Sequence, residues 1–357
     1  MSQPLDRKVV IVTGAGRGLG RAVPLACAAA GARVVVNDTG GAIDGTGVDE
    51  QPALEVARQI AACGGQAVAS YASVADRSAA QSLVELALSR YSRVDALVNN
   101  AGIARQNMIW DMPEGDFDAI LGTHLKGAWN CMSAVVGPFI EQRHGCIINV
   151  SSGVAVIGAV ANTGYTAAKA GVIGLTMGAA LDLGPYGIRV NVVFPAGHSR
   201  LDGKPEPWRD RYPTHPRAPI PADRWPPEAV PPLFVYLASD AARDVNGQLF
   251  ACGAGSVSWY PTWRAAREIT SNDPVFSYDE LASRIPTELL ADATNPSPHR
   301  AKTAYGSGRA STHYPRRTTR SRPNDRSPTS IRATGPLTEQ TRQTPDPLAP
   351  RAERSTG

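Results

Sequence analysis

Short apolar runs alternate with longer helix-like stretches along most of this 357-residue chain, and this alternation limits the fold more than any other feature. The runs are rich in β-branched residues and are apolar at consecutive positions, which is typical of strands covered on both faces of a parallel sheet. Since a helix-like stretch follows each run, we expect βαβ units. The sequence therefore predicts an α/β fold: a single, doubly wound parallel sheet with helices on both faces.

The predicted elements follow one another without an internal repeat. The expected strands cover residues 8–13, 33–37, 67–71, 96–99, 146–151, 189–193 and 247–252. The expected helices cover residues 19–30, 51–63, 78–91, 117–141, 165–183 and 233–242.

Three later segments depart from this pattern. Residues 198–232 hold ten prolines and show no period, so we expect a long loop that covers an active site as a substrate lid. Residues 261–294 are expected to form a C-terminal extension with a weakly periodic helix over 278–293. Residues 295–357 have low complexity and predict a disordered tail. The catalytic domain is therefore expected to be residues 1–260.

The charge of the chain is divided unevenly. Its formal net charge is +4, but residues 295–357 hold 12 basic and 4 acidic residues, whereas residues 1–294 hold 24 basic and 28 acidic residues. The basic character thus belongs to the tail. Its arginines lack interleaved aromatic residues or a recognition motif, so we expect no nucleic-acid partner.

The cysteines and the apolar segments predict a cytoplasmic protein. The five cysteines are scattered without a CxxC pair, which favours reduced thiols over a disulfide framework or a metal site. There is no run of 18 apolar residues, so no membrane span is expected. The first eight residues are polar and lack the apolar region of a signal peptide.

A glycine-rich turn lies between the first predicted strand and the first predicted helix. Gly14, Gly16, Gly18 and Gly20 would let the backbone approach a pyrophosphate, whose charge would lie against the helix N-terminus. A plain strand-to-helix turn explains such a cluster as well. The surrounding strand and helix favour a Rossmann-type dinucleotide site.

Asp38 predicts the nucleotide that this site binds. It stands 18 residues after Gly20, at the end of the second strand, where a carboxylate accepts the ribose hydroxyls and repels a 2′-phosphate. NAD is therefore expected over NADP. Two observations keep the alternative open: Asp38 would also cap the turn before Gly40, and Arg17 could bind a 2′-phosphate.

Three polar residues predict proton transfer at a substrate hydroxyl. Tyr165 and Lys169 are four residues apart on a predicted helix and so share one face. A phenol titrates near ~10, and a nearby ammonium favours the phenolate that a base requires. Ser152 follows a predicted strand, 13 residues before Tyr165, and could hydrogen-bond the substrate oxygen. A surface helix pair and a loop serine are the alternative interpretation.

Together these motifs resemble those of the short-chain dehydrogenase/reductase family over about residues 5–256. The matches are TGAGRGLG at 13–20, Asp38, NNAG at 99–102, Ser152, Tyr165 and Lys169. The resemblance implies a homodimer or homotetramer built through helices 117–141 and 165–183. It also implies the following cofactor-binding residues: Gly14, Gly16, Arg17, Gly18, Leu19, Gly20, Asp38, Ser73, Val74, Asn100, Ala101, Gly102, Tyr165 and Lys169.

Residues 34–47 and the HLKG sequence at 124–127 narrow the resemblance. They are similar to the (3R)-hydroxyacyl-CoA dehydrogenase module of peroxisomal multifunctional enzyme type 2 and to related bacterial enzymes. This implies a 3-hydroxyacyl-CoA or another lipid or steroid substrate. It also implies a catalytic proton relay through His124, where most of the wider family has asparagine; a packed structural histidine is the alternative. Ala196 departs from the glycine that many members have after the proline at this point.

Two other functions are compatible with these residues. The first is an NADP-dependent reductase of 3-oxoacyl groups or other ketones. The second is a nucleotide-binding relative that acts as a regulator without catalysis.

Overall fold

The computed structural model describes residues 3–197, 226–261, 265–271, 275–291 and 293. Most of the predicted lid, including all of residues 198–225, and the whole predicted tail lie outside the described residues.

The core of the molecule is an eight-stranded sheet in the order β3-β2-β1-β4-β5-β6-β7-β8. All neighbouring pairs are parallel except β7 and β8, which are antiparallel. The strands are β1 (Val9–Thr13), β2 (Arg33–Asn37), β3 (Gln66–Ser70), β4 (Ala96–Asn99), β5 (Gly145–Val150), β6 (Ile188–Pro195), β7 (Leu249–Gly253) and β8 (Ser256–Tyr260). The predicted doubly wound parallel sheet is confirmed.

Helices connect the strands and cover the sheet. The α-helices are α1 (Gly18–Ala29), α2 (Gln51–Ala62), α3 (Arg77–Tyr91), α4 (Glu114–Leu121), α5 (Gly127–Gln142), α6 (Val154–Ile157), α7 (Thr163–Leu183), α9 (Pro231–Ala238) and α10 (Tyr278–Arg284). The 3₁₀ and π turns are η1 (Gly122–Lys126), η2 (Gly184–Tyr186), η5 (Pro227–Ala229), η6 (Asp240–Ala242) and η7 (Ile285–Leu289).

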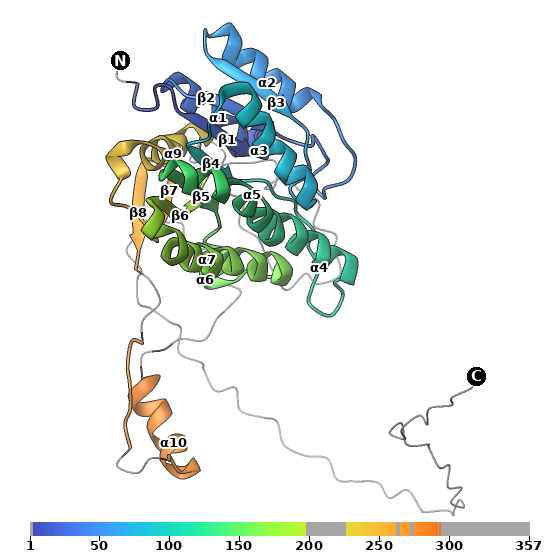
Figure 1. The fold of residues 1–357 in the computed structure, drawn as a ribbon. Helices are drawn as coiled ribbons and strands as arrows, with labels where there is room; N and C mark the ends of the chain where they lie inside the picture. Colours follow the sequence, from blue (N-terminus) through green and yellow to red (C-terminus); the bar gives the residue numbers. More distant parts are fainter. Residues whose placement is uncertain (1–2, 198–225, 262–264, 272–274, 292, 294–357) are drawn as a thin grey trace, which may run out of the picture. The chain divides into compact units, whose positions relative to one another are not determined.

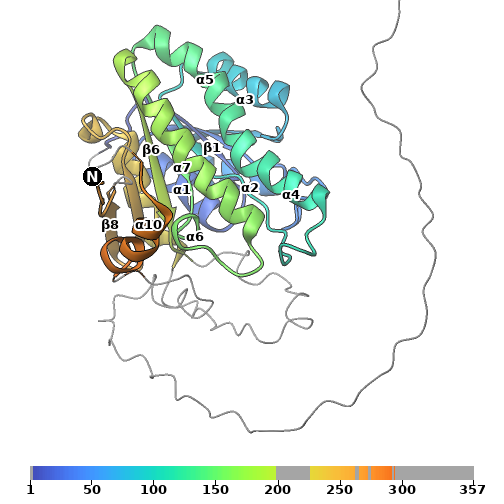
Figure 2. The ribbon, with the colours of Figure 1, turned by 90° about the horizontal axis from the view of Figure 1, so that it is seen from below.

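Helices cover both faces of the sheet (Figures 1 and 2), and an apolar core lies on each face. Because successive strand residues point to opposite faces, Val10 and Val12 pack with α1, α2 and α9, whereas Val9 and Ile11 pack with α3 and α5. A third cluster joins α7 to β6 and β7. The sheet is therefore buried on both sides.

The strand order creates a crevice beside β1. The chain proceeds from β1 to β2 on one side and, later, from β4 to β5 on the other, so the connections diverge between β1 and β4. Ligands of doubly wound sheets bind at the carboxyl ends of the strands at this point. The residues after β1, β4 and β5 are therefore the first candidates for a site.

The structure corrects several predicted boundaries. The predicted helix 117–141 begins at Glu114 and contains the π turn η1, and the helix expected to begin at Tyr165 begins at Thr163. The last residues of the predicted loop are helical, because Pro231 and Pro232 occupy a first turn that needs no N–H donors. Neither α6 nor β8 was predicted.

Of the helices in the described part of the chain, none is long and apolar enough to cross a membrane.

Candidate active site

The glycine-rich turn after β1 needs its glycines for backbone conformation and for space. Gly14 and Gly18 have φ of +62° and +54°. A Cβ on Gly20 would lie 1.8 Å from the Gly14 carbonyl oxygen, and one on Gly14 would lie 2.6 Å from Ala101 Cα. The turn is therefore closely packed against itself and against the segment that follows β4.

Helix α1 begins at Gly18 with its N-terminus in this turn. The side chain of its N-cap residue, Arg17, makes no capping bond to the described first turn. The amides of the first turn of a helix have no partner within the helix, and together with the helix dipole they favour an anion. The cradle therefore fits the pyrophosphate of a dinucleotide.

The segment after β4 braces the glycine-rich turn. Asn100 Nδ2 donates to the carbonyls of Thr13 (3.0 Å) and Gly14 (2.9 Å). The backbone N–H groups of Asn100 and Ala101 both donate to Thr13 Oγ1 at 3.1 Å. Asn100 and Ala101 thus hold the segment after β4 against the glycine-rich turn after β1. Thr13, which the sequence did not single out, is the acceptor that joins its two sides.

Asp38 lies at the end of β2 with its carboxylate against the turn. Oδ2 accepts from Gly16 N and Oδ1 accepts from Gly40 N, both at 2.7 Å. The residue thus caps the loop before Gly40, as the alternative interpretation predicted. Each carboxylate oxygen keeps a further lone pair, and the residue is 8% exposed. The arrangement leaves acceptor capacity for a ribose.

Other predicted cofactor residues lie at the start of α1 and in the segments that follow β3 and β4. Val74 is buried and its carbonyl accepts from Asn130 Nδ2 at 2.8 Å, whereas Ser73 is exposed. Leu19 lies against Gly197.

Tyr165 and Lys169 lie one turn apart near the start of α7. Lys169 Nζ is 5.7 Å from the centroid of the Tyr165 ring and donates to the Val150 carbonyl at 2.7 Å. Burial lowers the pKa of the Lys169 ammonium to about 7. Ser151 Oγ donates to the Lys169 carbonyl at 2.7 Å. These two bonds tie α7 to the end of β5.

Ser152 directly follows these contacts at the end of β5. It is half-buried, and its Oγ accepts from the backbone N–H of Val154, the first residue of the short helix α6, at 3.4 Å. The position agrees with the predicted placement at the carboxyl end of a strand.

His124 lies on the inner side of the π turn η1 and packs edge-on against Tyr165, with ring centroids 5.1 Å apart and an interplanar angle of 86°. Its Nε2 is 2.8 Å from the Ile103 carbonyl and 3.1 Å from Ile103 N. Within the described residues Nδ1 is buried without a hydrogen-bond partner. Burial and the nearby Lys169 charge lower the pKa of His124 to about 3. The imidazole is therefore neutral near pH 7.

A row of buried polar side chains, which was not predicted from the sequence, runs from β4 through β5 to α7. Asn99 Nδ2 donates to Asn149 Oδ1 at 2.9 Å, and Asn149 Nδ2 donates to Thr176 Oγ1 at 2.9 Å. Asn99 thus faces away from the glycine-rich turn that Asn100 braces. Polar residues inside otherwise apolar strands were the signal that could have identified this row.

Comparisons with known proteins agree with this geometry. The family model described as short chain dehydrogenase matches residues 8–200. The chain is 42% identical over 244 residues to L-rhamnose 1-dehydrogenase (NAD(P)(+)) of Azotobacter vinelandii, covering 67% of this chain and 93% of that protein. It is 36% identical over 250 residues to peroxisomal multifunctional enzyme type 2 of Drosophila melanogaster, covering 70% of this chain and 39% of that longer protein.

A solved structure supports the same relationship. The crystal structure of a short chain dehydrogenase from Mycobacterium avium matches with a TM-score of 0.69 and 38% identity, covering 82% of this chain and 98% of that chain. The chain therefore belongs to the short-chain dehydrogenase/reductase family, whose members are NAD(P)-dependent oxidoreductases.

Proposed function

We propose that this protein oxidises a secondary alcohol to a ketone with NAD+, most specifically a 3-hydroxyacyl-CoA or a related lipid or steroid alcohol. The observation that carries the proposal is the convergence of Tyr165, Lys169 and His124 at the carboxyl end of the sheet, beside the glycine-rich cradle. Tyr165 acts as the base, Ser152 anchors the substrate oxygen and Lys169 favours the phenolate.

In the proposed reaction the substrate loses a proton and a hydride, and each has its own acceptor. The substrate hydroxyl gives its proton to the Tyr165 phenolate, and the C–O single bond becomes a carbonyl as the carbinol C–H bond breaks. When bound, a nicotinamide would supply the acceptor for the hydride, the two electrons and hydrogen that leave this carbon. Lys169 holds its ammonium beside the Tyr165 ring and would also bind the nicotinamide ribose. His124 passes protons through its neutral ring.

NAD is the proposed cofactor because of the groups around the adenosine side. Asp38 presents a carboxylate there, which disfavours a 2′-phosphate. Arg17, the residue that could favour NADP, directs its guanidinium to the carbonyls of Gly40 and Gly41 at 3.1 and 3.2 Å. A preference for NADPH is the alternative outcome.

The segments that follow β4 and β5 support an apolar substrate. Ile109, Trp110 and Val156 are 67%, 64% and 49% exposed. Gln106 Nε2 donates to Asn162 Oδ1 at 2.7 Å, which joins the segment after β4 to the residues just before Tyr165. Exposed apolar side chains on both segments suit an acyl chain or a sterol better than a sugar.

A substrate panel tests the proposal. Purified protein is mixed with NAD+ and with 3-hydroxyacyl-CoAs of increasing chain length, steroid alcohols and L-rhamnose, and NADH formation is followed by absorbance. We expect turnover with the acyl or steroid alcohols. Turnover with the sugar alone would reject the substrate class, and no turnover with any alcohol would reject the oxidoreductase reaction.

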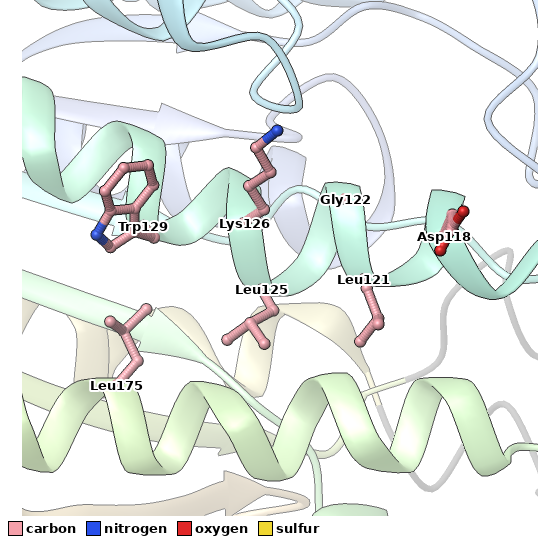
Figure 3. Close-up of a pocket in the computed structure, with 7 residues that line it drawn as sticks. All are labelled: Asp118, Leu121, Gly122, Leu125, Lys126, Trp129 and Leu175. Atoms are coloured by element: carbon pink, nitrogen blue, oxygen red, sulfur yellow. The ribbon is translucent and has the colours of Figure 1, made fainter. Parts of the chain in front are cut away.

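We further propose that the chain forms a homodimer through α4, α5 and α7. A groove of about 570 Å³ lies on these helices, with Leu121, Leu125 and Leu175 among its lining residues. Figure 3 shows Leu121 and Leu125 pointing toward α7 and Leu175 pointing back. Among the described residues, no atom outside α7 lies within 4 Å of a Cβ built on Gly174 or Gly178, so a second helix can approach closely.

A further inference from the structure

The loop between β2 and α2, residues 39–50, follows a path that its glycines determine. Gly40, Gly45 and Gly47 have φ of +69°, +87° and +72°. The loop begins directly after Asp38 and ends at the start of α2. We call it the β2–α2 loop.

Arg17 reaches from the glycine-rich turn to both ends of this loop. One guanidinium nitrogen, Nη1, donates to the carbonyls of Gly40 and Gly41. The other, Nη2, lies 3.5 Å from Asp49 Oδ2. The positive charge of Arg17 is therefore directed at the loop and paired with Asp49.

Asp49 is well placed to hold this cation. Its backbone N–H donates to the Thr39 carbonyl at 2.9 Å, which closes the loop. Its Oδ1 accepts from Gln51 N at 3.0 Å, so Oδ2 is the oxygen that faces Arg17. The carboxylate is thereby oriented from both sides of the residue.

The same loop contacts Asp38. The N–H of Gly40 donates to Asp38 Oδ1, while the carbonyl of Gly40 accepts from Arg17. Gly40 therefore contacts both the guanidinium of Arg17 and the carboxylate of Asp38, which is proposed to bind the adenosine ribose. A 2′-phosphate on that ribose would lie close to Arg17 and would need its charge.

We propose that Asp49 is a positioning residue for cofactor choice: by pairing with Arg17 it withholds that cation from a 2′-phosphate and so favours NAD over NADP. The inference rests on the proposed placement of the adenosine ribose at Asp38. According to this inference, two effects favour NAD over NADP. Asp38 repels the 2′-phosphate, and the β2–α2 loop binds the guanidinium of Arg17.

Direct titration of the dinucleotides tests the proposal. Dissociation constants for NADH and NADPH are measured by nucleotide fluorescence with wild type, Asp49→Asn and Asp49→Glu. The asparagine keeps an oxygen for Gln51 N but loses the charge. We expect Asp49→Asn to bind NADPH about fivefold more tightly, the equivalent of ~1 kcal/mol for a half-exposed ion pair, with the NADH constant nearly unchanged. Asp49→Glu, which keeps the charge, should resemble wild type.

Two controls make the result specific. Asp44→Asn removes an acid from the same loop that bonds to Thr46, so it measures the effect of net charge alone. In Arg17→Ala/Asp49→Asn the gain in NADPH binding should disappear. Equal NADPH binding by Asp49→Asn and Asp44→Asn, or a gain that persists without Arg17, would overturn the inference.

The wild-type protein separates this inference from the proposed cofactor. If wild type binds NADPH more tightly than NADH, both the NAD assignment and the role of Asp49 are rejected. If wild type prefers NADH and Asp49→Asn does not change the preference, only the role of Asp49 is rejected. A thermal melt of each variant confirms that the compared proteins are folded.

Discussion

At the scale of single residues, burying the ammonium of Lys169 has a large electrostatic cost. Lys169 is 4% exposed, and its Nζ donates to the carbonyl of Val150. Burial lowers its pKa to about 7, so the folded protein binds fewer protons here than the unfolded chain at every pH from about 7 to ~10.4. Stability must therefore rise with pH across this range.

This cost predicts that the free energies of unfolding of wild type and Lys169→Met depend differently on pH. Between pH 6 and pH 9 we expect wild type to gain about 2–3 kcal/mol of unfolding free energy relative to the variant, because the variant has no ammonium to bury. Chemical denaturation at both pH values measures the difference. Parallel pH dependences of the two proteins would show that Lys169 is not desolvated as described.

The helix that carries the proposed reacting residues was predictable from the sequence, whereas their electrostatic partners were not. Tyr165 and Lys169 were placed on one helix face by their spacing, and α7 confirms that placement. Lys169 Nζ donates to the carbonyl of Val150, which lies 19 residues earlier in the chain. Arg17 pairs with Asp49, which lies at the far end of a glycine-rich loop. Local patterns carry no information on such contacts.

At the scale of elements, the π turn η1 is the feature that places His124. The turn interrupts the helix expected over 117–141 and directs His124 toward Tyr165, while Leu125 packs against Gly171 of α7. Turns of this kind occur often at functional sites. A π turn adds no apolar periodicity of its own, so the sequence predicted one continuous helix.

The π turn leads to a prediction for His124. A neutral relay needs an uncharged group that can both donate and accept, so His124→Asn should keep kcat within about tenfold of wild type. His124→Ala should lower kcat about 100-fold. The low pKa of His124, about 3, predicts that the asparagine variant keeps the wild-type pH profile above pH 5. If the loss of kcat in both variants is explained by a loss of stability, measured as a lower melting temperature, His124 has a structural role.

Strand prediction succeeded for the buried apolar runs and failed for β8, at one edge of the sheet. The bounds of β2 and β4 agree with the predicted 33–37 and 96–99. Strand β8 was missed because most of its side chains are exposed, including Val257 and Trp259, and its pairing is supplied by β7 through the turn at Ala254. An edge strand of this kind depends on its neighbour more than on its own sequence.

At the scale of the whole molecule, the βαβ alternation predicted a doubly wound parallel sheet but not the order of its strands. The crevice of this sheet brings together segments as distant as Gly14 and Ala101. The proposed dimer could not be inferred in the same way. It depends on a groove that forms where α4, η1, α5 and α7 lie side by side, and the periodicity of one helix does not show which helices become its neighbours.

The groove on α4, α5 and α7 gives a prediction for assembly. Trp129→Glu places a charge in the groove, so we expect the dimer to dissociate, with a shift to the monomer mass in light scattering coupled to size exclusion. Val48→Glu adds the same charge at an exposed apolar residue outside the groove and should leave the mass unchanged. A dimer that survives Trp129→Glu unaltered would place the interface elsewhere.

The central claim is that Tyr165 is the base in a dehydrogenation carried out beside the glycine-rich cradle. It is tested most directly by comparing Tyr165→Phe with wild type, using the best alcohol substrate and saturating NAD+. The phenylalanine keeps the ring against His124 but removes the hydroxyl. We predict that the turnover rate falls by about 100-fold or more, while NADH binding measured by fluorescence changes by less than about threefold. Wild-type turnover by Tyr165→Phe, with binding intact, would contradict the proposed mechanism.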